Sequence, residues 1–185
     1  MGDTSLQESL NDKYRAEAEQ RYAQFMEEIG GLTNGQLAHK ALDAGYIVRV
    51  QNGPLLVIEH WVVETMASGA ESVDYDNIDT ERGLLLTLPG LFKDDSYVQT
   101  ISTYIREEMK AQMAASEEKV YFLGEDDPAG FREIAADQEF YVNADSKLVI
   151  VFDEYEVAPG FMGVVEFEIP TEVIAPALQG SEYIK

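Results

Sequence analysis

The chain has no cysteine among its 185 residues and few basic ones. The missing cysteine excludes disulfide bonds, thiolate zinc sites and cysteine nucleophiles, but it leaves the cellular compartment open. Only 13 Lys and Arg stand against 35 Asp and Glu, for a formal net charge of −22. Such a surface is unsuited to phosphate backbones and to anionic membranes. We therefore expect no nucleic-acid partner, and we expect any charged partner to be basic.

Long hydrophobic runs are also missing. The longest candidate, Leu84–Phe92, is broken by Thr87, Pro89 and Gly90. It falls well short of the roughly 18 apolar residues that a membrane span needs. The polar, acidic start Met1–Thr4 is unlike a signal peptide. A 45% hydrophobic content nevertheless suffices for a core that needs no metal or disulfide.

Hydrophobic periodicity predicts an α+β fold with antiparallel sheets. A helix at residues 5–29 precedes a meander of strands at 46–51, 55–65, 72–78 and 84–88, with a hairpin turn at Asn52-Gly53. A second long helix starts at Ser96, and capping boxes are expected at Ser5/Glu8 and Ser96/Gln99. Shorter elements follow: strands at 120–123, 140–142, 148–152 and 165–169, and helices at 128–136 and 170–178. The pattern favours two packed helix-plus-antiparallel-sheet units, 1–94 and 95–185.

No residue set in the sequence indicates catalysis or a cofactor. The two histidines, His39 and His60, lack metal-ligand spacing, and a structural role is favoured for both. The acidic stretch Asp74–Asp79 has Ile78 and Asp79 where a calcium loop requires an oxygen ligand and glycine. We interpret it as a strand with a solvated acidic face. The sequence thus predicts no enzyme, no metal site and no cofactor.

The connection at residues 153–163 is the most informative segment. Pro159 restricts the backbone, Gly160 permits a tight turn, and Phe161 follows directly. Two interpretations stay open. Phe161 could pack in the core, as buried aromatics commonly do. Alternatively, a stiff loop could insert Phe161 into a partner's cleft, since rigid aromatic anchors lose little entropy on binding.

Several segments together resemble one known family, the RsiV-like anti-sigma factors, in their extracytoplasmic, lysozyme-sensing part. The resemblance extends from the first helix to about Leu178 and is most specific in the second half. It is carried by Tyr46–Val48, Trp61–Thr65, Leu86–Tyr97, Phe140–Asn143, Lys147–Gly160 and Phe161–Pro170.

The resemblance implies a receptor domain with a basic protein partner. In the family, a C-type lysozyme binds outside the cell, the receptor becomes susceptible to signal peptidase, and intramembrane cleavage releases an extracytoplasmic-function sigma factor. The membrane span and the cytoplasmic segment that holds the sigma factor are expected outside this chain. We therefore expect the chain to lie at the outer face of the membrane and to bind lysozyme without signalling by itself.

The resemblance also implies binding residues. The family loop that enters the lysozyme cleft aligns with Pro159, Gly160 and Phe161, and a second contact loop aligns near Ser68 and Gly69. The family usually has tyrosine where this chain has Phe161, so a hydroxyl is missing and apolar stacking remains.

Two other functions stay open. The chain could be a non-catalytic module that binds cell-wall glycan, as in some peptidoglycan deacetylases, with Trp61 or Tyr155 as an aromatic platform. It could also be a hydrolase that uses two carboxylates in one cleft. Nothing in the sequence selects such a pair.

Overall fold

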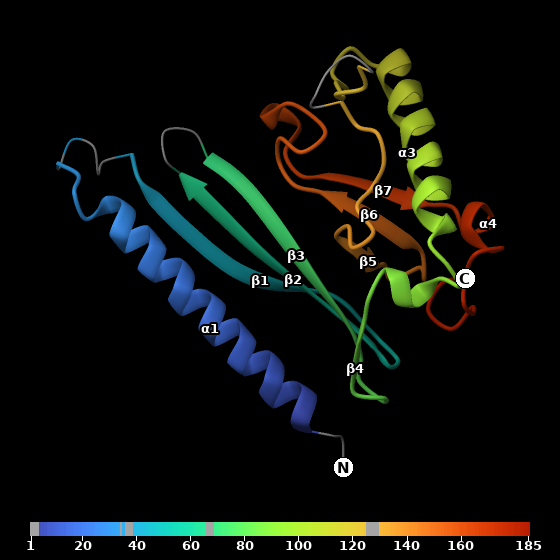
Figure 1. Ribbon diagram of the computed structural model, residues 1–185, viewed down its shortest axis with the longest axis horizontal. Coiled ribbons are helices and arrows are strands. Elements are labelled where there is room, and N and C mark those ends of the chain that lie inside the picture. Colours follow the sequence, from blue (N-terminus) through green and yellow to red (C-terminus); the bar gives the residue numbers. More distant parts are fainter. Residues whose placement is uncertain (1–3, 34, 36–38, 66–68, 125–129) are drawn as a thin grey trace.

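Two antiparallel sheets form the framework of the computed structural model, which describes residues 4–33, 35, 39–65, 69–124 and 130–185 (Figure 1). The first sheet has the order β1-β2-β3-β4 and the second β5-β6-β7. The predicted α+β class is confirmed. The strands are β1 Ala41–Asn52, β2 Leu55–Thr65, β3 Gly69–Asp79, β4 Leu84–Leu86, β5 Phe140–Val142, β6 Leu148–Phe152 and β7 Val165–Ile169. The helices are α1 Thr4–Ile29, α3 Ser96–Ala115 and α4 Thr171–Ile174, with 3-10 turns η1 Pro89–Leu91 and η2 Gly160–Met162.

The first sheet is the predicted meander, but β1 begins five residues earlier than expected. Ala41 pairs with Thr65, and the ladder runs to Asn52 opposite Leu55. Residues 41–45 have weak strand propensity, so pairing with the long β2 overrides the local preference. Gly45 is required here because a Cβ atom would lie 2.6 Å from the indole of Trp61, its cross-strand partner.

The hydrophobic core joins both halves of the chain. From α3, the side chains of Ile101, Ile105 and Met109 are fully buried. Every residue of β6 is buried, which confirms its central position, and β7 alternates buried and exposed residues. The same core includes Val57 and Val73 of the first sheet. The proposed boundary between residues 94 and 95 stays a prediction, since one core spans it.

The segment between α3 and β5 differs from the prediction. Residues 120–123 are not a strand, and residues 130–136 are not helical, while the start signal Asp127-Pro128 lies outside the described residues. Backbone hydrogen bonds organise the segment instead: Phe122 N–H donates to the Val157 carbonyl, and Phe131 N–H donates to the Phe122 carbonyl. The contacts are long-range, so local pattern could not reveal them. The terminal helix is likewise short and ends at Ile174, near Pro176.

The capping box predicted at the start of α3 is not formed as expected. At α3, the Asp94 carboxylate accepts a hydrogen bond from Ser96 N–H at 2.9 Å, and the Gln99 side chain bonds Thr103 instead of completing a capping box. Asp94 takes the capping role because its acceptor oxygen sits two residues before the free amide.

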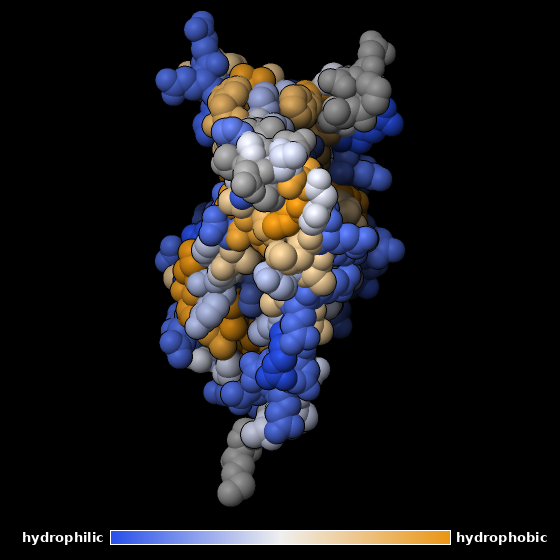
Figure 2. All heavy atoms as spheres, turned by 90° about the vertical axis from the view of Figure 1, so that its left-hand side faces the viewer, coloured by the Kyte–Doolittle hydropathy of each residue, from blue (hydrophilic) through white to orange (hydrophobic). Residues whose placement is uncertain are grey.

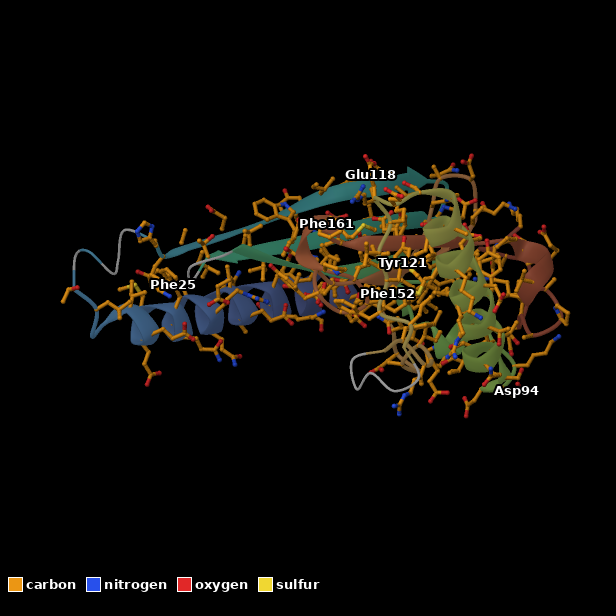
Figure 3. All side chains as sticks on the ribbon, turned by 90° about the horizontal axis from the view of Figure 1, so that it is seen from above. Phe25, Asp94, Glu118, Tyr121, Phe152 and Phe161 are labelled. Atoms are coloured by element: carbon orange, nitrogen blue, oxygen red, sulfur yellow. The ribbon has the colours of Figure 1, made fainter. Side chains whose placement is uncertain are left out.

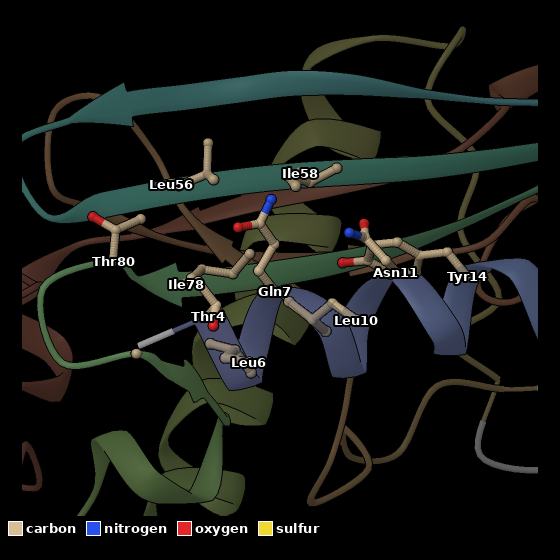
Figure 4. A pocket seen from close by; sticks show the side chains of 11 residues that line it. Thr4, Leu6, Gln7, Leu10, Asn11, Tyr14, Leu56, Ile58, Ile78 and Thr80 are labelled. Atoms are coloured by element: carbon tan, nitrogen blue, oxygen red, sulfur yellow. The ribbon is translucent and has the colours of Figure 1, made fainter. Parts of the chain in front are cut away.

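Helix α1 packs loosely on one face of the first sheet. Leu10 is the one buried residue of α1, and Tyr22 and Met26 are exposed. The helix stays apart from the sheet, and a groove of about 540 Å³ separates them (Figure 4). The groove is lined from the helix side by Leu6, Gln7, Leu10 and Asn11, and from the sheet side by Leu56, Ile58 and Ile78.

Polar contacts hold α1 where hydrophobic packing is thin. Tyr14 O–H donates to the Asp76 carboxylate at 2.6 Å, and Lys13 Nζ lies 3.7 Å from the same side chain. The ring of His60 packs at a tilt against Tyr14, with the ring centroids 4.4 Å apart, which fits its expected structural role. The acidic strand is therefore not simply solvated: Asp76 is buried, as is Asp79, which accepts from Tyr183.

Candidate functional site

The candidate site is the loop of residues 153–163, which joins β6 to β7. Val157 and Ala158, in its middle, are buried, and the Val157 carbonyl accepts from Phe122 N–H at 2.8 Å. The loop then turns through η2 and ends at Gly163, whose φ of +63° favours glycine. A loop with a buried middle and a defined turn presents its tip in a fixed place.

Phe161 lies at that tip and is 70% exposed (Figure 3). The neighbouring Met162 packs partly against the core, and Pro159 and Gly160 are half-buried. Of the two interpretations left open by the sequence, core packing of Phe161 is therefore excluded. A large aromatic side chain held out from a packed base is the geometry of a recognition anchor.

Tyr155 braces the loop tip. It adopts a φ of +72°, rare for a residue with a side chain, and its ring covers Gly160 so closely that a Cβ atom there would lie 2.3 Å from it. The ring itself is 50% exposed. Because Gly160 has no Cβ atom, the Tyr155 ring can approach its backbone closely. A second aromatic residue therefore lies next to the turn that carries Phe161. From the sequence, Tyr155 was considered only as an aromatic platform for glycan. Nothing in the sequence pattern indicates its positive φ.

Carboxylates tie this loop to the free edge of β3. Asp153 accepts from Val73 N–H at 2.8 Å, and Glu154 accepts from Glu71 N–H at 2.9 Å. Glu154 N–H returns a bond to the Glu71 carbonyl at 3.2 Å. Farther along the same edge, Glu139 accepts from Tyr75 N–H at 3.0 Å. Side-chain oxygens therefore take the place of a missing neighbouring strand, and they position the loop against the first sheet.

The second predicted contact region lies at the same end of β3. Gly69 is the first residue of β3, opposite Thr65, and it is exposed. It stands two residues before Glu71, which is bonded to the 153–163 loop. Ser68 lies outside the described residues. The structure thus brings Gly69 towards the loop that carries Pro159, Gly160 and Phe161, and their role in binding stays a prediction.

A partly buried polar network lies between the two sheets and was not predicted. Tyr75 O–H donates to Glu59 at 2.8 Å, and Tyr141 O–H donates to Glu166 at 2.9 Å. The guanidinium of Arg49 bonds Glu59 and lies near Glu166, so the carboxylates are matched by a cation. Among the residues that the structure describes, no group of three or more metal-ligating side chains could hold a metal ion.

Glu139, which accepts from Tyr75 N–H of β3, makes the stability of the contact between the two sheets depend on pH. Burial, reinforced by the negative charges of Asp74 and Asp153, raises the pKa of Glu139 to about 7, although the Tyr75 amide acts in the opposite direction. The folded-state pKa of Glu139 lies above its ordinary value of 4.5. The contribution of the protonated Glu139 to the free energy of unfolding is therefore complete below pH 4.5, and it is lost as pH rises through 7.

Glu139→Gln is therefore expected to remove part of this pH dependence. The amide oxygen can still accept from Tyr75, but no charge forms, so the variant should exceed the native chain in unfolding free energy by about 1 kcal/mol at pH 8 and lose that advantage at pH 5. Urea unfolding at both pH values measures the difference. Glu117→Gln, in the exposed turn after α3, is the control, and parallel pH curves for all three chains would contradict the prediction.

Comparisons with known proteins agree with this architecture. Residues 90–172 match the family described as a protein of unknown function, DUF3298. A crystal structure of a DUF3298 family member from Bacteroides fragilis NCTC 9343 aligns with a TM-score of 0.63 at 22% identity, covering 94% of this chain and 67% of that one. A DUF3298 family protein from Pseudomonas aeruginosa PAO1 aligns with a TM-score of 0.63 at 14% identity, covering 79% and 65%. These structures share the fold.

A curated relative is much more similar in sequence. The chain is 41% identical, over all 185 residues, to the anti-sigma-V factor RsiV of Bacillus subtilis strain 168, and it spans 64% of that protein's length. No helix in the described part of this chain is both long and apolar enough to cross a membrane. The full-length match and the DUF3298 region together support the resemblance of the chain to an RsiV-like extracytoplasmic domain.

Proposed function

We propose that the chain is the lysozyme-binding ectodomain of an anti-sigma factor, with a regulatory and non-catalytic role. Phe161 enters the sugar-binding cleft of a C-type lysozyme and occludes it. In the full-length protein, binding then triggers the proteolysis that frees an extracytoplasmic-function sigma factor. The observation that carries the proposal is the 70% exposed phenyl ring on a loop whose base is buried and hydrogen-bonded.

Charge supports the same partner. The chain carries a formal net charge of −22, and lysozymes of the sensed type are basic. Opposite charges accelerate encounter, and this acceleration is screened by salt. The similarity to the RsiV anti-sigma factor supports the link to a sigma factor, which would be held by a segment of the full-length protein outside this chain.

Titration calorimetry of the chain with a C-type lysozyme tests the proposal. We expect a one-to-one complex whose association rate falls about tenfold or more between low and high salt. Muramidase activity should fall in parallel with complex formation, and N-acetylglucosamine oligomers that fill the cleft should compete. No binding heat and unchanged muramidase activity would contradict the proposal. Binding without competition by the oligomers would exclude the cleft as the docking place.

A second candidate function is binding of cell-wall glycan, and one observation favours it. Tyr155 and Phe161 lie close together on one loop, and both expose at least half of their side chains. Trp61 contributes less, since it is partly buried over Gly45. Retention of the chain on insoluble peptidoglycan, lost in Tyr155→Ala, would support this alternative. A chain that binds lysozyme but stays unbound to the wall would dispose of it.

A further inference from the structure

The outer edge of β1 is a long strand edge without a neighbour. β1 has twelve residues and pairs on one side with β2, and in the described part of the chain no strand pairs with its other side. Most of its residues are exposed, whereas none of β2 is. An edge of this length offers unpaired N–H and C=O groups to another chain.

The edge is also apolar at its centre. Tyr46 is 71% exposed, Ile47 46% and Val48 48%. Tyr22 and Met26 of α1 are exposed as well, and Tyr22 lines the same hollow as Tyr46. Seen from the side of the molecule on which α1 and β1 lie, hydrophobic atoms are exposed between hydrophilic stretches (Figure 2). Half of the large hydrophobic side chains that the described residues expose thus belong to α1 and β1.

The usual protections of an edge strand are few here. Residues 41–52 contain no proline and no lysine. A bulge between Val48 and Val50 interrupts the ladder at Arg49, so regular backbone extends from Ala41 to Val48. The charged residues of the strand are one acid, Asp43, and one base, Arg49. They lie three positions before and three positions after Tyr46.

We propose that this edge pairs with the same edge of a second copy of the chain. In a two-fold antiparallel pairing centred on Tyr46, residues opposite one another have numbers that add to 92. Asp43 of each copy then stands opposite Arg49 of the other, at both ends of the paired stretch. Arg49 is 40% exposed while bonded to Glu59, and its guanidinium has five N–H donors, so it can reach a second carboxylate.

The self-complementary charge pattern favours a second copy over a basic peptide, because the peptide would meet the positive charge of Arg49 near one end of the strand. The two-fold axis stands perpendicular to the sheet, so both α1 helices stay on the same face and the two four-stranded sheets become continuous. Because each copy carries a charge of −22, the pairing is opposed by long-range repulsion. Association should therefore strengthen with salt, opposite to the lysozyme complex proposed above.

The pairing leaves the 153–163 loop open. That loop is bonded to β3, and β2 separates β3 from β1. The loop and the free edge of β1 therefore lie towards opposite edges of the first sheet (Figure 1). A dimer would thus present two Phe161 side chains and could bind two partner molecules at once. The β1 edge and the 153–163 loop are different surfaces, so pairing of two copies does not depend on lysozyme binding.

A single engineered cysteine tests the register, because the chain has no other. Directly opposed antiparallel residues have Cα atoms about 4.5 or 5.5 Å apart, within the range that a disulfide spans. Tyr46→Cys should therefore form a covalent dimer under a glutathione redox buffer. Ala44→Cys, exposed on the same strand, is the matched control: its two copies would lie about 14 Å apart and should stay unlinked.

Sedimentation velocity of the native chain tests the association itself. We expect a weak, concentration-dependent dimer whose association constant rises at least about fivefold from ~0.1 M to ~1 M NaCl, as the screening length falls from ~10 to ~3 Å. Ile47→Lys should abolish the dimer. Leu84→Lys, on the opposite end of the sheet order, should retain it. A native chain that stays monomeric, a dimer that survives Ile47→Lys, or linkage of Ala44→Cys in preference to Tyr46→Cys would overturn the proposal.

Discussion

Asn77→Ala is expected to lower the free energy of unfolding by about 3 kcal/mol. Asn77 lies on β3 and has no exposed surface. Its amide nitrogen donates to the Phe140 carbonyl at 2.9 Å, and its amide oxygen accepts from Val142 N–H at 2.9 Å. Alanine would leave a buried carbonyl and a buried amide without partners, and each costs about 1–3 kcal/mol. The loss should exceed that of most exposed substitutions several-fold.

Chemical unfolding at neutral pH measures this effect. Asn11→Ala provides the control, since Asn11 is exposed on α1 and its loss should change the unfolding free energy by no more than about 0.5 kcal/mol. The expected damage is also local. Because Asn77 joins β3 to β5, backbone amide exchange should rise first at Val142 and along the β3 edge. A chain as stable as the native one would show that the amide pair is not needed to join the sheets.

The contacts between the two sheets show which parts of the fold could be predicted from the sequence and which could not. The strands of the meander, α3 and β7 are set by short-range period and turn chemistry, and the sequence predicted that each is present. The carboxylates that cap β3 come from residues 64 to 83 positions away. In a chain with 35 acidic residues, no local pattern distinguishes Glu139 or Asp153 from a solvated carboxylate.

For helix α1, the sequence predicted the helix itself but not how it packs on the sheet. Its residues have helical period, and the helix forms as predicted, but period says nothing about how far a helix stands from its sheet. The polar groups at the interface, Gln7 and Asn11, help to explain why the groove stays open. The helix expected at 128–136 is absent from residues 130–136 for a related reason. Phe131 and Ile134 are buried there in an irregular segment, in which Phe131 N–H donates to the Phe122 carbonyl and Ile134 N–H donates to the Ser102 hydroxyl.

The candidate site was partly accessible to sequence reasoning. Pro159 and Gly160 indicated a stiff turn, and the structure shows the turn with Phe161 exposed beside it. The brace by Tyr155 and the attachment to β3 were not predictable, because both depend on a positive φ and on strand-edge bonds. These contacts hold the loop in place before any partner binds, which lowers the entropic cost of binding.

Phe161→Ala should for this reason weaken the proposed lysozyme complex by roughly 2 kcal/mol, or about thirtyfold in dissociation constant. The phenyl ring would be buried on binding, and alanine would leave its place in the cleft empty. Since the ring is 70% exposed in the free chain, its removal should leave the unfolding free energy within about 0.5 kcal/mol. Calorimetric titration and chemical unfolding of the same variant therefore separate recognition from stability.

Two further variants sharpen the test. Leu84→Ala removes an exposed apolar side chain from β4, away from the loop, and should leave the affinity unchanged. Phe161→Tyr restores the hydroxyl that the RsiV-like family usually has, and it should bind at least as tightly as the native chain because the ring is retained. If Phe161→Ala bound lysozyme as well as the native chain, the anchor would lie elsewhere. If Phe161→Tyr bound more weakly, the cleft would have to be apolar where the ring tip enters, contrary to a sugar-binding surface.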